Sequence, residues 1–428
     1  MIPGVSMATQ VSLASETQLV RYTRWALAIT FACMPLYVVR WHVGPIPTTL
    51  LENLVFVTIG LYVVARTRSA YWPPERTSLE VPILLFLVAG LIGIAVSYDH
   101  VGALGHYRAY FIEPVILLYI AIDLLRTAGH FRTVLLGLVI GTTVFAIMNL
   151  GAWAIALAHH EVITPANAPE ALYTSPNEVA LFLEPPLAIA AGFALHADQG
   201  RDRKVALGCL VFLLPALVLT LSRGGLLTMA VLALVAVATM PQLRLKLALL
   251  GGAVVGGLAV SQVPWVASRL ARQLDLNYRW NTLAIRSRIW GDTLHMLRDH
   301  PIFGAGIRAY SRVMVPYVTD VRVPEILPHN IWLAMWAEIG LLGLASFAVI
   351  MALLLWRGWR AFARATGFYR ALLWGTSAAF VAIAVHGFFD TPYFKNDLAV
   401  EFWMLAALEI AAIRALAYGG TGNRRLER

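Results

Sequence analysis

Apolar residues recur along this chain in stretches of about 20, and short polar segments separate one stretch from the next. A helix of about 20 apolar residues is long enough to cross the hydrocarbon core of a bilayer. The pattern therefore predicts an all-α, polytopic integral membrane protein with about 12 transmembrane helices. The expected spans are residues 24–43, 47–65, 79–97, 107–125, 133–157, 178–196, 204–222, 225–241, 245–262, 330–356, 370–388 and 398–417.

One long polar segment, residues 263–329, separates the ninth expected span from the tenth. Neither a repeat nor a low-complexity tract divides the chain. We therefore expect residues 1–428 to form a single membrane domain into which residues 263–329 are inserted as a large helical loop, or cap. Another polar segment, residues 159–186, ends in Glu184-Pro185-Pro186, and these prolines are expected to interrupt the following helix.

The cap contains one helix that the sequence defines well, over about residues 282–299, followed by His300-Pro301. At 100° per residue, Arg288 shares a polar stripe with Asp292, His295 and Asp299, whereas Arg286 shares the opposite stripe with Trp290, Thr293, Leu294 and Leu297. We expect Arg286, rather than Arg288, to point toward the interior.

Composition supports the membrane class. The chain is 59% hydrophobic and 13% charged, with a mean hydropathy of +0.70, whereas soluble domains carry about 25% charged residues. A water-soluble globular domain is excluded. The first residues lack the pattern of a cleaved secretory signal, so the first apolar stretch is expected to remain as a span. Cys33 and Cys209 fall inside expected spans, which favours packing over a disulfide framework.

Basic residues predict the orientation, because short loops rich in Lys and Arg stay in the cytoplasm. With the N-terminus inside, most basic residues lie in inner loops, and the short outer loops contain only Arg40, Arg108, Arg223 and Lys395. We therefore expect cytoplasmic termini and an outer cap, which is long enough to be translocated whatever its charge. The formal net charge of +9 reflects this topology and gives no basis for a nucleic-acid partner.

Four polar motifs fall on the outer side in this topology: LSRGG (221–225), AIRSRIW (284–290), LPHN (327–330) and HGFFDTPYFKND (386–397). In the first motif, Arg223 ends the seventh span and two glycines permit a tight turn into the eighth. Backbone N–H groups and a guanidinium can together face an anion such as phosphate. The alternative is an arginine that extends to the interface beside an ordinary turn.

In LPHN, Pro328 and the expected N-cap Asn330 place His329 where the tenth span begins. An imidazole there can take a proton from a hydroxyl nucleophile; the alternative is a structural histidine. His386 and Asp390 are spaced i,i+4 and are expected to pair with each other, first for structure and second for catalytic support. Carboxylates in or near spans are often functional, and Glu113, Glu184, Glu338 and Glu401 stay unassigned.

No zinc-ligand spacing, P-loop or Asp-x-Asp pair occurs in the expected outer segments, so no metal and no cofactor is predicted. Arginines are then left to bind an anionic leaving group.

The motifs SRGG, the Arg286-x-x-x-Trp290 pattern, DHPIFGAG (299–306) and PHNIWLAMWAEIGLLG (328–343), followed by HGFFDTPYF, resemble the O-antigen ligase and polymerase superfamily of bacterial envelope enzymes. The resemblance runs from about residue 221 to 394. It implies a metal-independent, inverting, GT-C-like glycosyltransferase of the bacterial inner membrane, with its active site facing the periplasm. Arg223 and Arg286 match the family's two arginines, and His329 matches its essential histidine.

The resemblance further implies a donor glycan on a polyprenyl (undecaprenyl) diphosphate and, for a ligase, a sugar hydroxyl of lipid A-core as acceptor. Membrane lipids surround the protein. A polymerase of lipid-linked repeats and a ligase that modifies proteins are the alternatives. We expect His329 to be the catalytic base and the substrate-binding residues to be Arg223, Arg286, Arg288 and Asn330. A transporter of an envelope lipid is a rival class, motivated by the number of spans and by the proline-interrupted helix.

Overall fold

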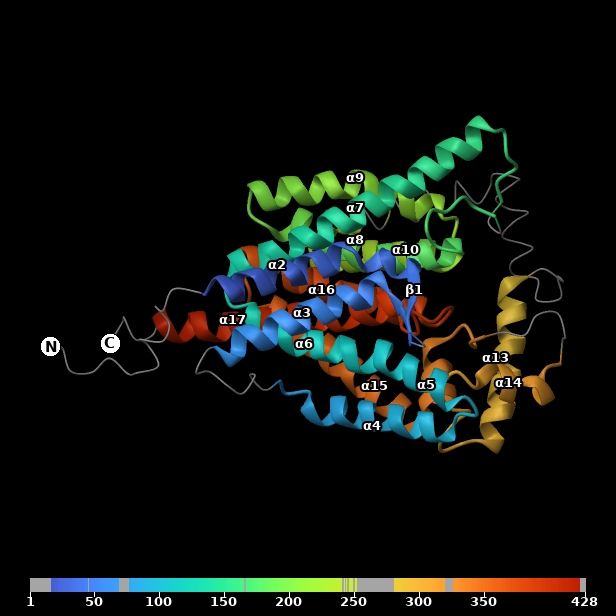
Figure 1. Ribbon diagram of the computed structural model, residues 1–428. Helices are drawn as coiled ribbons and strands as arrows, with labels where there is room; N and C mark the ends of the chain where they lie inside the picture. Colours follow the sequence, from blue (N-terminus) through green and yellow to red (C-terminus); the bar gives the residue numbers. More distant parts are fainter. Residues whose placement is uncertain are drawn as a thin grey trace.

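The computed structural model describes residues 17–44, 46–68, 77–164, 167–240, 281–319 and 326–423, together with positions 242, 244, 246–248 and 251. Most of the expected ninth span and residues 263–280 of the cap lie outside these residues. The described chain forms a bundle of helices with helix α13 lying across one end, which we call the cap end (Figure 1).

The elements follow in chain order. They are α2 (Gln18–Ala32), η2 (Met34–Val38), β1 (Arg40–Val43), β2 (Ile46–Thr49), α3 (Leu50–Thr67), α4 (Glu80–Val96), α5 (His100–Tyr107), η3 (Arg108–Ile112), α6 (Glu113–Leu124), α7 (Ala128–Ala158), α8 (Pro176–His196), α9 (Arg201–Leu219), α10 (Arg223–Thr239), α13 (Thr282–Asp299), α14 (Tyr310–Val313), η4 (Val315–Tyr317), α15 (Ile331–Phe362), α16 (Gly367–His386) and α17 (Asn396–Asn423).

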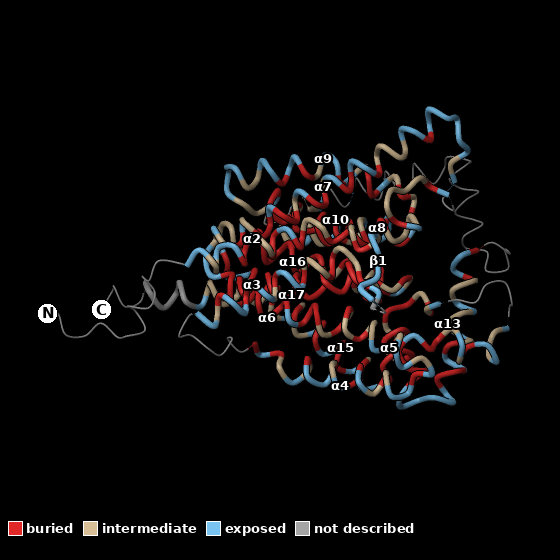
Figure 2. The backbone as a smooth tube through the Cα atoms, in the orientation of Figure 1, coloured by how far each residue is buried: buried red, intermediate tan, exposed pale blue. Residues whose placement is uncertain are grey.

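The helices and their surfaces are those of a membrane protein. Among the described residues, five helices are long and apolar enough to cross a bilayer, namely α3, α7, α8, α15 and α16, and α4 and α10 are apolar but shorter. Large apolar side chains face outward, for example Val81 and Val211, each 67% exposed. Buried residues run along the inside of the bundle (Figure 2), so the outer surface is suited to lipid. The number of 12 crossings stays a prediction.

The chain enters and leaves the bundle on the same side. Figure 1 shows α2 beginning and α17 ending at the end of the bundle opposite α13. This arrangement agrees with an orientation in which both ends of the chain face one compartment and the cap faces the other.

The first expected span, residues 24–43, is not one continuous helix. Helix α2 ends at Ala32, a 3₁₀ segment containing Pro35 follows, and residues 40–43 pair with 46–49 in an antiparallel hairpin. Pro35 donates no backbone hydrogen bond and so ends the helical ladder. Gly44, with a φ of +59°, supplies the left-handed backbone of the turn. This hairpin is a small exception to the all-α fold.

The expected interruption at Pro185-Pro186 is also absent, because α8 is continuous from Pro176 to His196. The cause is packing: α8 is buried along most of its length and lies directly against α16. A Cβ added at Gly375 would lie 2.7 Å from Ile189 Cα, so the two backbones are in close contact. This contact offsets the two backbone bonds that the prolines remove. One of the two observations that motivated a transporter, the interrupted helix, is therefore absent.

Helix α15 contains a break that fixes the cap. Ile339 and Gly340 have non-helical backbones, with Gly340 at φ +72°. The segment after α13 enters the break: Leu341 donates its N–H to Ile302 O at 2.9 Å, and Ala305 donates to Ala337 O at 2.7 Å. A Cβ on Gly340 would clash with Ile302 O. The DHPIFGAG motif thus docks the cap on α15.

Candidate active site

Helix α13 brings one arginine to the site and leaves the other outside. Its observed bounds, Thr282–Asp299, confirm the predicted helix, and the Asn281 side chain accepts hydrogen bonds from the first turn. Arg286 is 18% exposed and directs Nη2 toward Asp390, whereas Arg288 is exposed and donates from Nε to its own helix at Ala284 O. The prediction that Arg286 faces inward is confirmed. Leu294, expected on the same face, is instead exposed.

His329 lies in a constrained turn at the start of α15. The Asn330 side chain caps the helix, accepting from Trp332 N and Leu333 N at 3.0 Å each, which confirms the predicted N-cap. Its Nδ2 also donates to Phe388 O at 3.2 Å. His329 has a φ of +48°, a left-handed backbone that costs a non-glycine residue free energy and is common at functional sites. The turn therefore holds the imidazole beside residues 387–390.

Asp390 joins the histidine to the arginine. Its Oδ1 lies 3.2 Å from His329 Nδ1, and its Oδ2 lies 3.5 Å from Arg286 Nη2. The exposed fractions of the side chains are 37% for His329, 10% for Asp390 and 18% for Arg286. Trp290 Nε1 donates to Pro328 O at 3.1 Å and ties α13 to the histidine turn. The carboxylate is thus covered while the imidazole stays accessible.

Electrostatics keep Asp390 ionised. Burial by itself would raise the pKa of Asp390, but the hydrogen bond and charge of His329, with the nearby His386 and Arg286, lower the pKa from 3.8 to about 2. A carboxylate bonded to Nδ1 favours the tautomer with Nδ1–H, which leaves the lone pair on Nε2. The arrangement therefore suits His329 to take a proton through Nε2.

The expected pairing of His386 with Asp390 is wrong. His386 Nδ1 lies 2.7 Å from Glu184 Oε1 of α8, and the two side chains are 1% and 2% exposed. Helix α16 ends at His386 with Gly387 as C-cap, and Asp390 donates its backbone N–H to His386 O at 2.9 Å while the two side chains turn to different partners. The sequence singled out Asp390 but gave it the wrong histidine, because the partner of His386 lies on a distant helix, α8.

The LSRGG motif folds differently from the expectation. Arg223 begins α10 instead of ending the preceding helix, and the turn is made by Leu221 at φ +53°, with the Ser222 side chain as N-cap. Gly224 lies in the first turn, where a Cβ would clash with the His386 ring. The glycines therefore permit close helix packing. Arg223 Nη1 donates to Thr282 Oγ1, one helical turn before Arg286 on α13.

Three of the four unassigned glutamates have polar partners that account for them. Glu338 Oε2 accepts the Arg308 backbone N–H at 2.6 Å beside the α15 break, and Glu113 lies 3.0 Å from Arg108 Nε. Glu184 holds His386, and Glu401 is buried in α17. Within the described ranges, no group of three or more His, Cys, Asp or Glu residues is placed to hold a metal ion.

A comparison with known protein families covers part of the segment that contains these residues. The family model described as "O-Antigen ligase" matches residues 208–348, which include Arg223, Arg286 and His329. No curated protein matches the chain. The resemblance to the O-antigen ligase superfamily is thereby confirmed over these residues, and it supports a membrane transferase of the ligase and polymerase type.

Proposed function

We propose that this protein is an O-antigen ligase of the bacterial inner membrane. It transfers a glycan from a polyprenyl diphosphate donor to a sugar hydroxyl of lipid A-core on the periplasmic side. The observation that carries the proposal is the His329–Asp390–Arg286 cluster at the cap end, of which two members lie in the segment similar to the O-antigen ligase family.

His329 acts as the general base. The acceptor hydroxyl oxygen attacks the anomeric carbon, its proton passes to His329 Nε2, and the bond from that carbon to the diphosphate oxygen breaks. Asp390 accepts the Nδ1–H hydrogen bond and stabilises the imidazolium that forms. Attack from the face opposite the leaving group inverts the anomeric carbon. Such a base contributes about 10²–10⁴ in rate.

Arg286 and Arg223 stabilise the diphosphate as it leaves. A guanidinium has five N–H donors, so Arg286 can keep its contact with Asp390 while other donors face phosphate oxygens. Arg223 lies on the neighbouring helix, joined to the start of α13 through Thr282. Arg288, on the exposed side of α13, is the candidate for contacts with the more distant glycan. Asn330 serves the site by holding the histidine turn.

A reconstituted transfer assay tests this function. Purified protein in lipid nanodiscs receives a radiolabelled polyprenyl-diphosphate glycan and lipid A-core, and the product is labelled lipopolysaccharide. Replacing lipid A-core by a second lipid-linked glycan tests polymerisation. Labelled lipopolysaccharide from the first mixture alone supports the ligase, whereas lengthened lipid-linked glycan from the second reassigns the protein as a polymerase. Movement of the donor between leaflets with its glycan linkage intact, and no product, rejects the transferase.

A deletion strain provides an independent test in cells. The ligase proposal predicts that long glycan disappears from lipid A while lipid-linked polymer accumulates. Accumulation of single lipid-linked repeats contradicts it, since that result follows from loss of a polymerase.

A further inference from the structure

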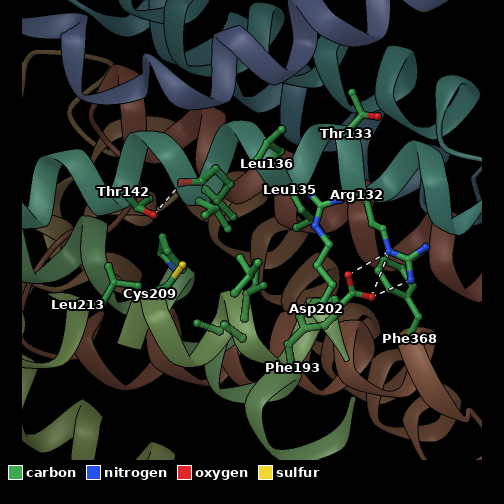
Figure 3. A pocket seen from close by; sticks show the side chains of 18 of the residues that line it. Arg132, Thr133, Leu135, Leu136, Thr142, Phe193, Asp202, Cys209, Leu213 and Phe368 are labelled. Carbon is green, nitrogen blue, oxygen red and sulfur yellow. Dashed lines mark hydrogen bonds and ion pairs between the residues drawn. The ribbon is translucent and has the colours of Figure 1, made fainter. Parts of the chain in front are cut away.

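A cavity of about 270 Å³ lies between α7, α8 and α9 (Figure 3). Its lining residues on α7 and α9 lie toward the starts of these helices, at the end of the bundle opposite α13 (Figure 1). Its wall is largely apolar, with Leu135, Leu138, Ile189, Phe193 and Leu213 among the lining residues. The Thr142 hydroxyl at its inner end donates to Leu138 O at 2.7 Å and so is satisfied within its own helix.

The depth of the cavity matches one leaflet. Arg132 at the mouth and Thr142 at the inner end both line it on α7, and their separation along a helix is roughly 15 Å. The hydrocarbon core of a bilayer is about 30 Å thick. The volume lies just under the about 300–1,000 Å³ usual for whole small-molecule sites, so it admits one acyl chain and leaves a headgroup outside.

The mouth is polar and held rigidly. Arg132 Nη2 lies 2.7 Å from Asp202 Oδ2, and the Arg132 guanidinium lies 4.9 Å from the centre of the Phe368 ring. Figure 3 shows Arg132 and Asp202 together at one edge of the cavity. Asp202 balances the charge of Arg132, so the neighbouring lining residue Arg201 makes the mouth positive. Trp25, 46% exposed, lines it from α2, a residue type enriched at membrane interfaces.

We propose that this cavity binds one acyl chain of an anionic phospholipid from the cytoplasmic leaflet, with the headgroup beside Arg201. The apolar wall is suited to bind the acyl chain, and the excess positive charge at the mouth is suited to attract the acidic headgroup. The site lies at the other end of the bundle from His329 and is independent of the transfer chemistry.

Fluorescence quenching of Trp25 tests the proposal. The protein in dodecyl maltoside is titrated with phosphatidylglycerol carrying brominated acyl chains, and a parallel titration uses brominated phosphatidylcholine. Because the chain contains 13 tryptophans, the difference between the wild type and Trp25→Phe isolates the Trp25 signal. We expect quenching to saturate with both lipids. The concentration at half-maximal quenching should be about fivefold lower for phosphatidylglycerol than for phosphatidylcholine, which is the gain in affinity that one basic residue near an acidic headgroup provides.

Four variants distinguish binding of the acyl chain from binding of the headgroup. Ala206→Phe fills the cavity and removes saturable quenching by both lipids, whereas Val211→Phe, on the same helix with an exposed side chain outside the lining, leaves it intact. Ala190→Leu is the milder filling variant if Ala206→Phe does not fold. Arg201→Gln removes the fivefold preference and keeps the saturation.

Three outcomes overturn the proposal. Quenching that rises linearly and equally in all variants means contact with bulk lipid only. Equal saturation by both lipids excludes headgroup selection. Displacement of the brominated lipid by polyprenyl phosphate, but not by unlabelled phosphatidylglycerol, assigns the cavity to an isoprenoid chain.

Discussion

Two histidine–carboxylate pairs lie near the cap end, and they differ in access. His329 Nδ1 is 3.2 Å from Asp390 Oδ1, and the His329 side chain is 37% exposed. His386 Nδ1 is 2.7 Å from Glu184 Oε1, and that pair is almost fully enclosed. The His386 Nε2 atom is buried without a hydrogen-bond partner in the part of the chain that the structure describes, and it faces Gly224.

The contrast shows that the same chemical pair serves different ends according to its surroundings. A base must reach the substrate's proton, so only the accessible pair suits proton transfer. The enclosed pair joins α8 to α16 and lies directly against α10. This packing positions the turn that carries Asp390. A short distance between histidine and carboxylate is therefore not by itself a sign of catalysis.

Replacing the accessible histidine gives the largest expected effect. His329→Gln should lower the transfer rate about 10²–10⁴-fold, because no side chain at that position then takes the acceptor proton. Donor binding, measured with the labelled lipid, should stay within about twofold of the wild type. Full activity in this variant would reject the assigned base, and loss of donor binding alone would make His329 a substrate contact.

Replacing the inward arginine should come next. Arg286→Ala should slow transfer about 10²–10³-fold, as expected when a preorganised donor to the developing anion is removed. Arg286→Lys should have a transfer rate between those of Arg286→Ala and the wild type, because an ammonium group lacks the paired donors of a guanidinium. Arg288→Ala is the matched control, because Arg288 lies two positions further along the same helix but is exposed. This variant should change the rate far less. Equal losses in the two alanine variants would remove the distinction between the helix faces.

Asp390→Asn should reduce the rate about 10–10²-fold, because the imidazolium loses its anionic partner while the turn keeps a similar side chain.

The pH dependence of stability gives a second test of Asp390. The native pKa of Asp390 is about 2, below its ordinary 3.8, so the native state binds fewer protons than the unfolded state between these values. The stabilisation is complete above about pH 4 and declines as pH falls toward 2.

In detergent, the difference in unfolding midpoint between the wild type and Asp390→Asn should accordingly shrink as the pH is lowered from 5 to 3. A difference that is constant over this range would mean that Asp390 is not held as a carboxylate by its neighbours.

The smallest expected effect concerns the enclosed pair. Gly224→Ala places a methyl group against the His386 ring, so we expect a loss of about 1–3 kcal/mol in unfolding free energy and a reduced rate with an unchanged pH profile. Gly208→Ala is the matched control, because a Cβ there meets nothing within 4 Å. A displaced pH profile in Gly224→Ala would instead give His386 a part in proton transfer.

Local signals in the sequence predicted the helix of the cap and the N-cap of α15 well. His300-Pro301 marks the end of α13, and the 100° periodicity separates Arg286 from Arg288. The N-cap role of Asn330 follows from the same local chemistry. These features depend on residues within a few positions of one another, so no tertiary contact has to be known.

The break of the first expected span at Pro35 has a local cause, whereas several other failures depend on contacts between distant segments. Pro185 and Pro186 remain helical because α16 packs against α8. The partner of His386 is Glu184, 202 positions away, and the partner of Asp390 is His329, 61 positions away. Both glycines of LSRGG lie in the first turn of α10, where Gly224 leaves room for the ring of His386 and Gly225 lies against Ala180. Such pairings depend on how helices meet in space, which local periodicity does not encode.

The pH dependence of a single turnover, with donor already bound and acceptor added in excess, tests the assignment of the base most directly. The rate of the wild type should fall at acid pH, in one acid limb of the pH–rate profile. Asp390→Asn should shift that limb to lower pH, because an imidazolium without its anionic neighbour gives up its proton more readily. His329→Gln should be slow at every pH and should show no acid limb. An unchanged acid limb in His329→Gln would contradict the account, since another group would then accept the hydroxyl proton.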